Sequence, residues 1–200
     1  TERGFLRHVL VRVGKNTGEI LVTLVGGNSM FPKKHDFVKA LVKRFPDITT
    51  VTFSVNRTPE MLLLGENNEV LYGEGYITDI LCGKRFRISP HSFYQINHAQ
   101  TEKLYDYAIK AAKLTKKDVL LDAYSGIGTI GIIASDYVKQ VQGIEYNASA
   151  VRDAVKNCHE NGLIRNIAFN RGDAGEFLEK KAKFGTHYDA VILDPARTGA

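Results

Sequence analysis

A glycine-rich loop directly after a buried strand is the feature that most constrains the fold of this 200-residue chain. The apolar run Val119–Leu121 predicts the strand, and Asp122–Gly131 forms a turn leading into a helix. A second apolar run, Ala190–Leu193, is followed by Asp194-Pro-Ala-Arg197. In an open parallel sheet, loops at the carboxyl ends of strands bind ligands. We therefore expect both segments to line one ligand site.

Strands and helices alternate after residue 100. The pattern predicts strands near 119–124, 140–146, 166–170 and 188–194, and helices near 101–113, 129–138, 148–161 and 173–182. This alternation indicates an α/β fold, a Rossmann-like parallel sheet with right-handed crossovers. The last strand should be central in such a sheet, with further strands beside it. We therefore expect that the sheet is incomplete at its C-terminus and that the chain is a fragment.

A small α+β domain is predicted over residues 1–85, ahead of the domain with the parallel sheet over 86–200. Its expected elements are a hairpin over 5–25, a helix over 35–45 and short strands at 49–55, 61–64 and 69–72. In the helix predicted over 101–113, one apolar stripe should face the core, and it comprises Leu104, Tyr105, Ala108, Ile109 and Ala112.

The chain is mildly basic, with a formal net charge of +5. Its lysines and arginines cluster at Lys33-Lys34, at Lys39, Lys43 and Arg44, and in Lys84–Arg87, close to aromatic residues. Such clusters suit the phosphates of a nucleic acid, although charged runs are often only solvated surfaces.

The cysteines and the apolar runs indicate where the protein works. Cys82 and Cys158 form no CxxC pattern, so no zinc site or disulfide framework is expected. No apolar run reaches the roughly 20 residues of a membrane helix, and no signal peptide is recognisable. We expect a cytoplasmic protein.

The glycine pattern by itself fits two cofactors. Gly126, Gly128 and Gly131 match the dinucleotide fingerprint, with acidic Glu145 placed to bind ribose hydroxyls. Asp122, however, precedes the first glycine, where its charge would repel a pyrophosphate and attract the ammonium group of S-adenosylmethionine (SAM). SAM is therefore favoured over NAD. The alternative for Asp122 is a cap of the following turn.

The chain resembles the SAM-dependent RNA uracil-C5 methyltransferases, which make 5-methyluridine in transfer or ribosomal RNA. The resemblance rests on Leu6–Gly14, Leu71–Asp79, Phe86–Asn97 with Gln100-Thr-Glu102, Asp122–Gly131 and Asp194–Gly199. Its most specific part joins Phe93, Gln95 and Asn97 to the Asp-Pro-x-Arg segment. Ser125 stands where many members have Cys, and Ala196 replaces a second proline; we expect these to tune binding rather than abolish it.

The resemblance implies a role for each matching residue. Glu145 would hold the ribose, Asp173 would lie near the adenine, and Asp194 would bind the cofactor near the reaction centre. The full set of implied cofactor contacts is Gln95, Tyr124, Gly126, Gly128, Thr129, Glu145, Asp173 and Asp194. Arg197 would serve the RNA substrate.

Several of these residues have structural alternatives. Tyr124 could be core, Gln95 a surface amide, Asp173 a helix cap, and Arg197 a partner of Asp194.

The implied reaction requires a cysteine. Uracil C5 is a weak nucleophile until a thiolate adds to C6, and a base must afterwards remove the C5 proton. Cys82 precedes the methyltransferase domain and Cys158 lies within a helix, so neither fits. The resemblance places the nucleophile and the base beyond Ala200, so this chain alone should be inactive.

The expected partner is structured RNA, with ribosomal RNA favoured over transfer RNA and the target base flipped out. No metal is expected in this segment, and the protein is expected to be a monomer.

Three rival functions differ in their requirements. An NAD- or flavin-dependent oxidoreductase would leave Gln95 and Arg197 without a role. A methyltransferase of exocyclic amines usually has an aromatic residue at the position of Arg197. The third is a non-catalytic RNA-binding module with the same fold.

Overall fold

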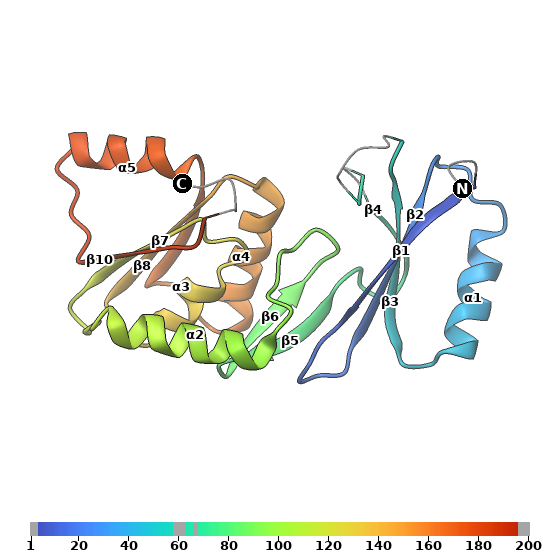
Figure 1. The fold of residues 1–200 in the computed structure, drawn as a ribbon, viewed down its shortest axis with the longest axis horizontal. Helices are drawn as coiled ribbons and strands as arrows, with labels where there is room; N and C mark the ends of the chain where they lie inside the picture. Colours follow the sequence, from blue (N-terminus) through green and yellow to red (C-terminus); the bar gives the residue numbers. More distant parts are fainter. Residues whose placement is uncertain (1–3, 58–62, 66–67, 196–200) are drawn as a thin grey trace. The chain divides into compact units, whose positions relative to one another are not determined.

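The computed structural model describes residues 4–57, 63–65 and 68–195. The chain divides into two compact units, Thr1–Ile80 with Arg87–His91, and Leu81–Phe86 with Ser92–Ala200. The division that we expected between residues 85 and 86 falls inside the segment Lys84–Ile88, where the chain passes between the units. Figure 1 shows the helices and strands of each unit.

The first unit is built on a four-stranded mixed sheet. Its elements are β1 (Leu6–Val13), β2 (Ile20–Gly26), α1 (Lys34–Arg44), β3 (Ile48–Val55) and β4 (Asn68–Tyr72), with strand order β1-β2-β3-β4. β2 and β3 are parallel and α1 connects them, whereas the outer pairs are antiparallel. Apolar residues of α1 pack on β2 and β3. The strand predicted over 61–64 is wrong where it can be judged, because Leu63 and Leu64 lie in a bend; 61 and 62 lie outside the described residues.

A hairpin of β5 (Ile77–Leu81) and β6 (Lys84–Ile88) was not predicted. Its two-residue turn places Cys82 at φ 49° and Gly83 at φ 76°. Positive φ at both positions is the geometry of a tight hairpin turn, which usually carries Asn or Asp before Gly. A cysteine in that position gives little turn signal, so the sequence did not indicate the hairpin.

The second unit contains the parallel sheet that the alternation predicted. Its elements are α2 (His98–Ala111), β7 (Val119–Ala123), α3 (Thr129–Ala134), β8 (Gln140–Glu145), α4 (Ala148–Glu160), β9 (Ile167–Arg171), α5 (Ala174–Lys183) and β10 (Ala190–Leu193). The strand order is β10-β7-β8-β9, and every pairing is parallel. The Rossmann-like fold class is confirmed.

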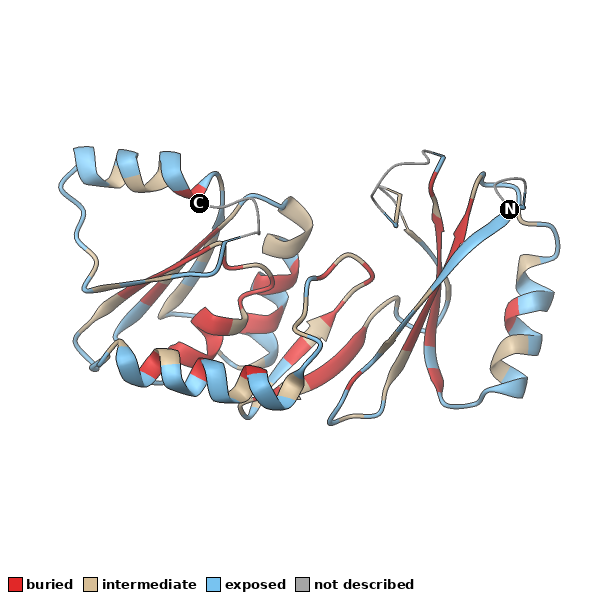
Figure 2. Ribbon diagram, in the orientation of Figure 1, coloured by how far each residue is buried: buried red, intermediate tan, exposed pale blue. Residues whose placement is uncertain are grey.

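Helices cover both faces of this sheet (Figure 1). Leu120 and Val141 face α2, α3 and α4, whereas Leu121 and Ile144 face α5. Because neighbouring residues of a strand point to opposite faces, both faces are apolar. α3 is buried along almost its whole length (Figure 2).

Two details of the helices differ from the sequence-based expectation. α3 ends at Ala134 rather than near 138, and the Ser135 hydroxyl donates to the Ile132 carbonyl at this end (2.7 Å). On α2, Tyr105 and Ile109 are buried as expected, but Leu104 is 58% exposed. The core therefore covers a narrower stripe of α2 than the apolar pattern suggested.

β10 forms the edge of the described sheet, where it pairs with β7. Val191 and Leu193 are 44% and 53% exposed. Within the described ranges, no helix is long and apolar enough to span a membrane.

Candidate functional site

The carboxyl ends of the parallel strands bring the predicted site residues to one edge of the second unit. Tyr124 to Gly128 follow β7, Glu145 ends β8, Asp173 follows β9 and Asp194 follows β10. Ile192 lies beside Asp122, and Ala123 beside Ile144. A ligand bound at this edge would therefore reach residues that are far apart in the sequence.

Backbone and side-chain hydrogen bonds hold the glycine loop against β8. The Gly126 N–H donates to Glu145 Oε2 (2.9 Å), and the Ser125 N–H donates to the Ile144 carbonyl (3.0 Å). Glu145 Oε1 accepts from the Asn147 N–H (2.7 Å). A carboxylate oxygen has two lone pairs, so Glu145 keeps acceptor capacity for a ligand hydroxyl.

The glycines of the loop differ in the space around them. Gly126 has φ 56°, and a Cβ placed there would meet nothing within 4 Å. Gly128 has φ 84°, and a Cβ there would lie 2.7 Å from Cζ of Phe169. Gly126 therefore has open space on its Cα, whereas Gly128 lets the Phe169 ring pack against the loop.

Asp122 is buried beneath the loop with 1% of its surface exposed. Its Oδ2 accepts from the Gly131 N–H in the first turn of α3 (2.8 Å). The N-cap residue of α3 is Gly128, so Asp122 supports this turn without being its N-cap, which was the alternative considered for it. Oδ1 is buried and has no hydrogen-bond partner among the residues that the structure describes. Burial raises the pKa of Asp122 to about 7; the Gly131 hydrogen bond opposes the shift, and the charges of Asp194 and Glu145 add to it.

Asp194 is exposed at the end of β10. Its N–H reaches the Ala123 carbonyl over a long 3.5 Å. The nearby Tyr105 hydroxyl shares a hydrogen bond with Thr129 Oγ1 (3.2 Å), and burial raises its pKa, with the charge of Asp194 contributing. Thr129, Tyr105, Asp122 and Asp194 therefore lie at the same end of the site.

The segment before α2, Phe93–Asn97, is more exposed to solvent than the glycine loop. Gln95 is half-buried, and the side chains of Phe93 and Ile96, close to it in the sequence, are largely exposed. Asn97 caps α2 by accepting from the Gln100 N–H (3.3 Å).

Tyr124 and Asp173 have the structural roles that were considered as alternatives for them, in the core and as a helix cap. Tyr124, at φ 61°, packs half-buried against the face of the sheet that α5 covers. Asp173 is exposed and caps α5, because its Oδ1 accepts from the Glu176 N–H (3.0 Å). Tyr124 directly follows β7 and Asp173 follows β9, so both residues lie at the carboxyl edge of the sheet. Arg197 lies outside the described residues.

The basic clusters are unequal. In Lys84–Arg87, Lys84 pairs with Asp136 (2.8 Å) and Arg87 stacks on Tyr76 at 3.3 Å from the ring centroid, so Arg85 presents the exposed cation of this run. On and beside α1, Lys33, Lys39, Lys43 and Arg44 are exposed, while Lys34 pairs with Glu69. The α1 surface is therefore the better candidate for phosphate contact.

Neither cysteine has the environment of a nucleophile. Burial raises the pKa of Cys158 to about 12. Burial also raises the pKa of Cys82, with the charges of Glu102 and Asp106 adding to the shift. A reactive thiolate needs the opposite change. In the described part of the chain, no group of three or more His, Cys, Asp or Glu could hold a metal ion.

Asn157 on α4 is a residue of this site that the sequence analysis missed. Its amide nitrogen donates to the Ile127 carbonyl, inside the glycine loop (3.0 Å), and its side chain is fully buried. The sequence could have indicated its burial, because Asn157 lies on the same side of α4 as the core residues Ala154 and Cys158.

Comparisons with known proteins agree with this arrangement. The family model described as tRNA (uracil-5-)-methyltransferase matches residues 60–194. An uncharacterized RNA methyltransferase of Oceanobacillus iheyensis is 39% identical over 199 residues, which are 100% of this chain and 43% of the relative. One from Caldanaerobacter subterraneus is 41% identical over 197 residues, again 43% of its length. The chain thus spans less than half the length of these relatives.

A solved structure is also similar. The tRNA (uracil-54, C5)-methyltransferase of Pyrococcus abyssi, in complex with S-adenosyl-L-homocysteine, superposes with a TM-score of 0.75 at 28% identity. The match covers 98% of this chain and 45% of that protein.

Proposed function

The chain belongs to the tRNA (uracil-5-)-methyltransferase family, as its motifs suggested, and we propose that it forms the SAM-binding part of an RNA methyltransferase. The complete enzyme would transfer the methyl group of SAM to C5 of a uridine in structured RNA. The observation that carries this proposal is the single edge at which Gly126, Glu145 and Asp194 converge.

The charges of this edge favour SAM over NAD. Asp122, Glu145 and Asp194 lie close enough for the last two to raise the pKa of the first. SAM carries a sulfonium and an ammonium, which such a group of carboxylates attracts, whereas the pyrophosphate of NAD would be repelled. NAD-dependent redox chemistry is therefore not favoured.

We assign the parts of SAM to residues along the edge. Glu145 would accept hydrogen bonds from the ribose hydroxyls, and Asp173 would lie near the adenine. Gly126 provides the open approach, with Tyr124, Gly128 and Thr129 shaping the loop around it. Gln95 and Asp194 would lie toward the methionine end, next to the reacting sulfonium.

The chemistry of C5 methylation assigns further roles to the complete enzyme. A cysteine thiolate adds to C6 of uracil, and C5 then attacks the SAM methyl group, leaving S-adenosylhomocysteine. A base removes the C5 proton, and elimination of the thiolate restores the aromatic ring. Cys82 and Cys158 are unsuited to this step, so we place the nucleophile and the base outside these 200 residues, and we expect this chain alone to be inactive.

The proposed substrate is RNA, bound through Arg197 near the target base and through the small N-terminal unit. The exposed lysines of α1 would contact phosphates. Ribosomal RNA is the substrate favoured from the sequence, whereas the family model and the Pyrococcus enzyme are named for transfer RNA. We expect this modification to occur in the cytoplasm, by a monomeric protein.

Calorimetric titration of the chain with SAM and, separately, with NAD tests the cofactor. We expect SAM to bind, NAD to give no heat, and Asp194→Ala to weaken SAM binding. Binding of NAD in place of SAM would contradict the proposal.

Filter binding with ribosomal and transfer RNA transcripts tests the substrate. Replacing Lys39 and Lys43 together with alanine should weaken binding. The slope of log K against log salt concentration should become shallower by about one to two, because up to two phosphate contacts are lost. Replacing the exposed Lys116 and Lys117 together with alanine, in the segment before β7, is the matched control. Equal losses in both variants would argue against the α1 surface, and tighter binding of one transcript would identify the RNA class.

A further inference from the structure

One face of α4 and its C-cap residue carry a polar stripe of Asp153, Asn157 and Asn161, spaced four residues apart. Residues at this spacing lie above one another on a helix. Asp153 is 5% exposed and Asn157 0% exposed. Buried polar side chains are retained where they form hydrogen bonds, and each of these three reaches a different segment of the second unit.

Asn157 holds the glycine loop from the side of α4. Its Nδ2 donates to the carbonyl of Ile127, which stands between Gly126 and Gly128 (3.0 Å). Glu145 holds the same loop at Gly126, and Asp122 holds Gly131 behind it. Asn157 is thus the third side chain that fixes this segment.

Asp153, one turn earlier, holds the other segment that carries a proposed cofactor contact. Its Oδ2 accepts from the hydroxyl of Ser92 (3.0 Å), and both side chains are buried. Ser92 lies three residues before Gln95. One helix face therefore fixes both the glycine loop and the start of the Phe93–Asn97 segment.

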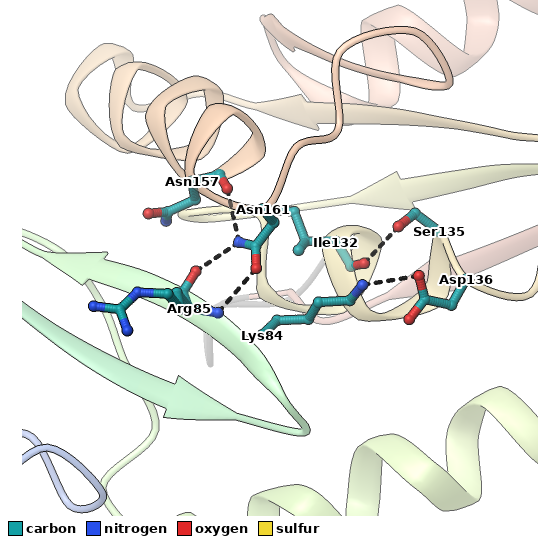
Figure 3. A network of polar contacts seen from close by, with 7 residues as sticks. All are labelled: Lys84, Arg85, Ile132, Ser135, Asp136, Asn157 and Asn161. Carbon is teal, nitrogen blue, oxygen red and sulfur yellow. Dashed lines mark hydrogen bonds and ion pairs between the residues drawn. The ribbon is translucent and has the colours of Figure 1, made fainter.

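Asn161 holds a segment with no proposed cofactor contact. Its Nδ2 donates to the Arg85 carbonyl (2.7 Å), and its Oδ1 accepts from the Arg85 N–H (3.0 Å), as if it were a neighbouring strand (Figure 3). The same Nδ2 also lies 2.8 Å from the Asn157 carbonyl. Asn161 is therefore a natural control for the two residues before it.

The backbone of the loop that Asn157 holds has an energetically unfavourable conformation. Tyr124, Gly126 and Gly128 all have positive φ, and for Tyr124 this conformation is unfavourable. Surrounding contacts must maintain such a conformation. A loop released on one side would have to be ordered again when ligand binds, which lowers affinity.

We infer that Asn157 and Asp153 are positioning residues for SAM: they touch no ligand but hold the glycine loop and the Gln95 segment in the binding conformation. This inference rests on the proposed function. It also assigns to α4 a role that the motifs of the family resemblance do not include.

The test compares Asn157→Ala with Asn161→Ala in the same chain. Each removes one amide from the same helix face, and thermal unfolding measures the stability lost. We expect Asn157→Ala to weaken SAM binding about tenfold, while Asn161→Ala changes it by less than about twofold. Asn157→Leu keeps the branched shape of the side chain without its hydrogen-bonding groups and should bind as weakly as the alanine variant. Losses that simply follow stability in all variants would overturn the inference.

Hydrogen exchange in the ligand-free chain separates this inference from the proposed function. The Gly126 and Gly128 amides should exchange faster in Asn157→Ala and Asn157→Leu than in Asn161→Ala. Unchanged exchange at both glycines would overturn the positioning role. A wild-type chain that binds no SAM, but shows the expected exchange, would contradict the proposed function and leave the positioning of the loop supported.

Discussion

The ends of β7 and β10 are neighbours in the sheet, and each carries an aspartate in a different environment. Asp122 is buried away from solvent, and its carboxylate accepts a hydrogen bond from the Gly131 N–H. Asp194 is exposed, and its N–H makes a long contact with the Ala123 carbonyl. Two aspartates at the same sheet edge therefore differ in role: Asp122 supports the loop, and we propose that Asp194 contacts the ligand.

The same division applies to the glycines. The ring of Phe169 occupies the space beside the Cα of Gly128, whereas the space beside the Cα of Gly126 is open. The proposed site thus has a packed layer, comprising Asp122 and Gly128, and an open layer that we propose contacts the ligand. This contact layer comprises Gly126 and Asp194. Substitutions in the packed layer should lower stability, and those in the contact layer should lower affinity.

The largest effect is expected at Gly128. Gly128→Ala combines an unfavourable positive φ with a collision against Phe169, and should lower the free energy of unfolding by about 2 to 5 kcal/mol. Gly126→Ala meets no neighbour and should cost only about 1 to 2 kcal/mol, from its φ. Urea unfolding of both variants measures the difference. Equal losses would mean that the two glycines do not belong to different layers.

Asp194→Ala should have the second largest effect, on binding alone. Loss of a charge-assisted contact to SAM should weaken binding about 10- to 100-fold. The unfolding free energy should change by less than about 0.5 kcal/mol, because the side chain is exposed. Calorimetry and urea unfolding on the same preparation check both. A large loss of stability would place Asp194 in the packed layer.

A smaller effect is expected from pH. The pKa of Asp122 is about 7 in the folded chain, above its ordinary value near 4, so its contribution to stability is fully present below about pH 4 and is lost as the pH rises through about 7. A cationic ligand near this carboxylate lowers its pKa. SAM affinity should therefore rise by up to about tenfold between pH 6 and 8.

Asp122→Asn is the control for this pH dependence. Its side-chain oxygen can still accept from Gly131, but it does not titrate, so the rise in affinity should be reduced and the fall in stability over this range removed. Titrations at pH 6, 7 and 8 measure both. An identical pH profile in wild type and variant would mean that Asp122 does not sense the ligand.

The architecture of the second unit could be predicted because its signals are local. Apolar runs marked β7 and β10, and the following glycines and aspartates marked their ends. Glu145 could be placed at the ligand edge for the same reason, since it ends the next strand.

What the sequence did not reveal depends on contacts between distant segments. Gly128 and Gly126 are alike in the motif, and only the position of Phe169 on β9 separates them. Asn157 reads as an ordinary helical residue until its amide is seen on Ile127. The β5–β6 hairpin was missed because Cys82 occupies a turn position where other residues are usual.

Asp173 combines both environments and should show the smallest effect. It is exposed like Asp194, yet its carboxylate accepts a hydrogen bond from the first turn of α5, as that of Asp122 does from the first turn of α3. Asp173→Asn keeps a capping oxygen, so stability should be unchanged and SAM affinity should fall by no more than about threefold. Asp173→Ala removes the cap and should lower the unfolding free energy by about 1 kcal/mol. If Asp173→Asn instead lost as much affinity as Asp194→Ala, the charge of Asp173 would bind the cofactor directly, and the contact layer would extend to the end of β9.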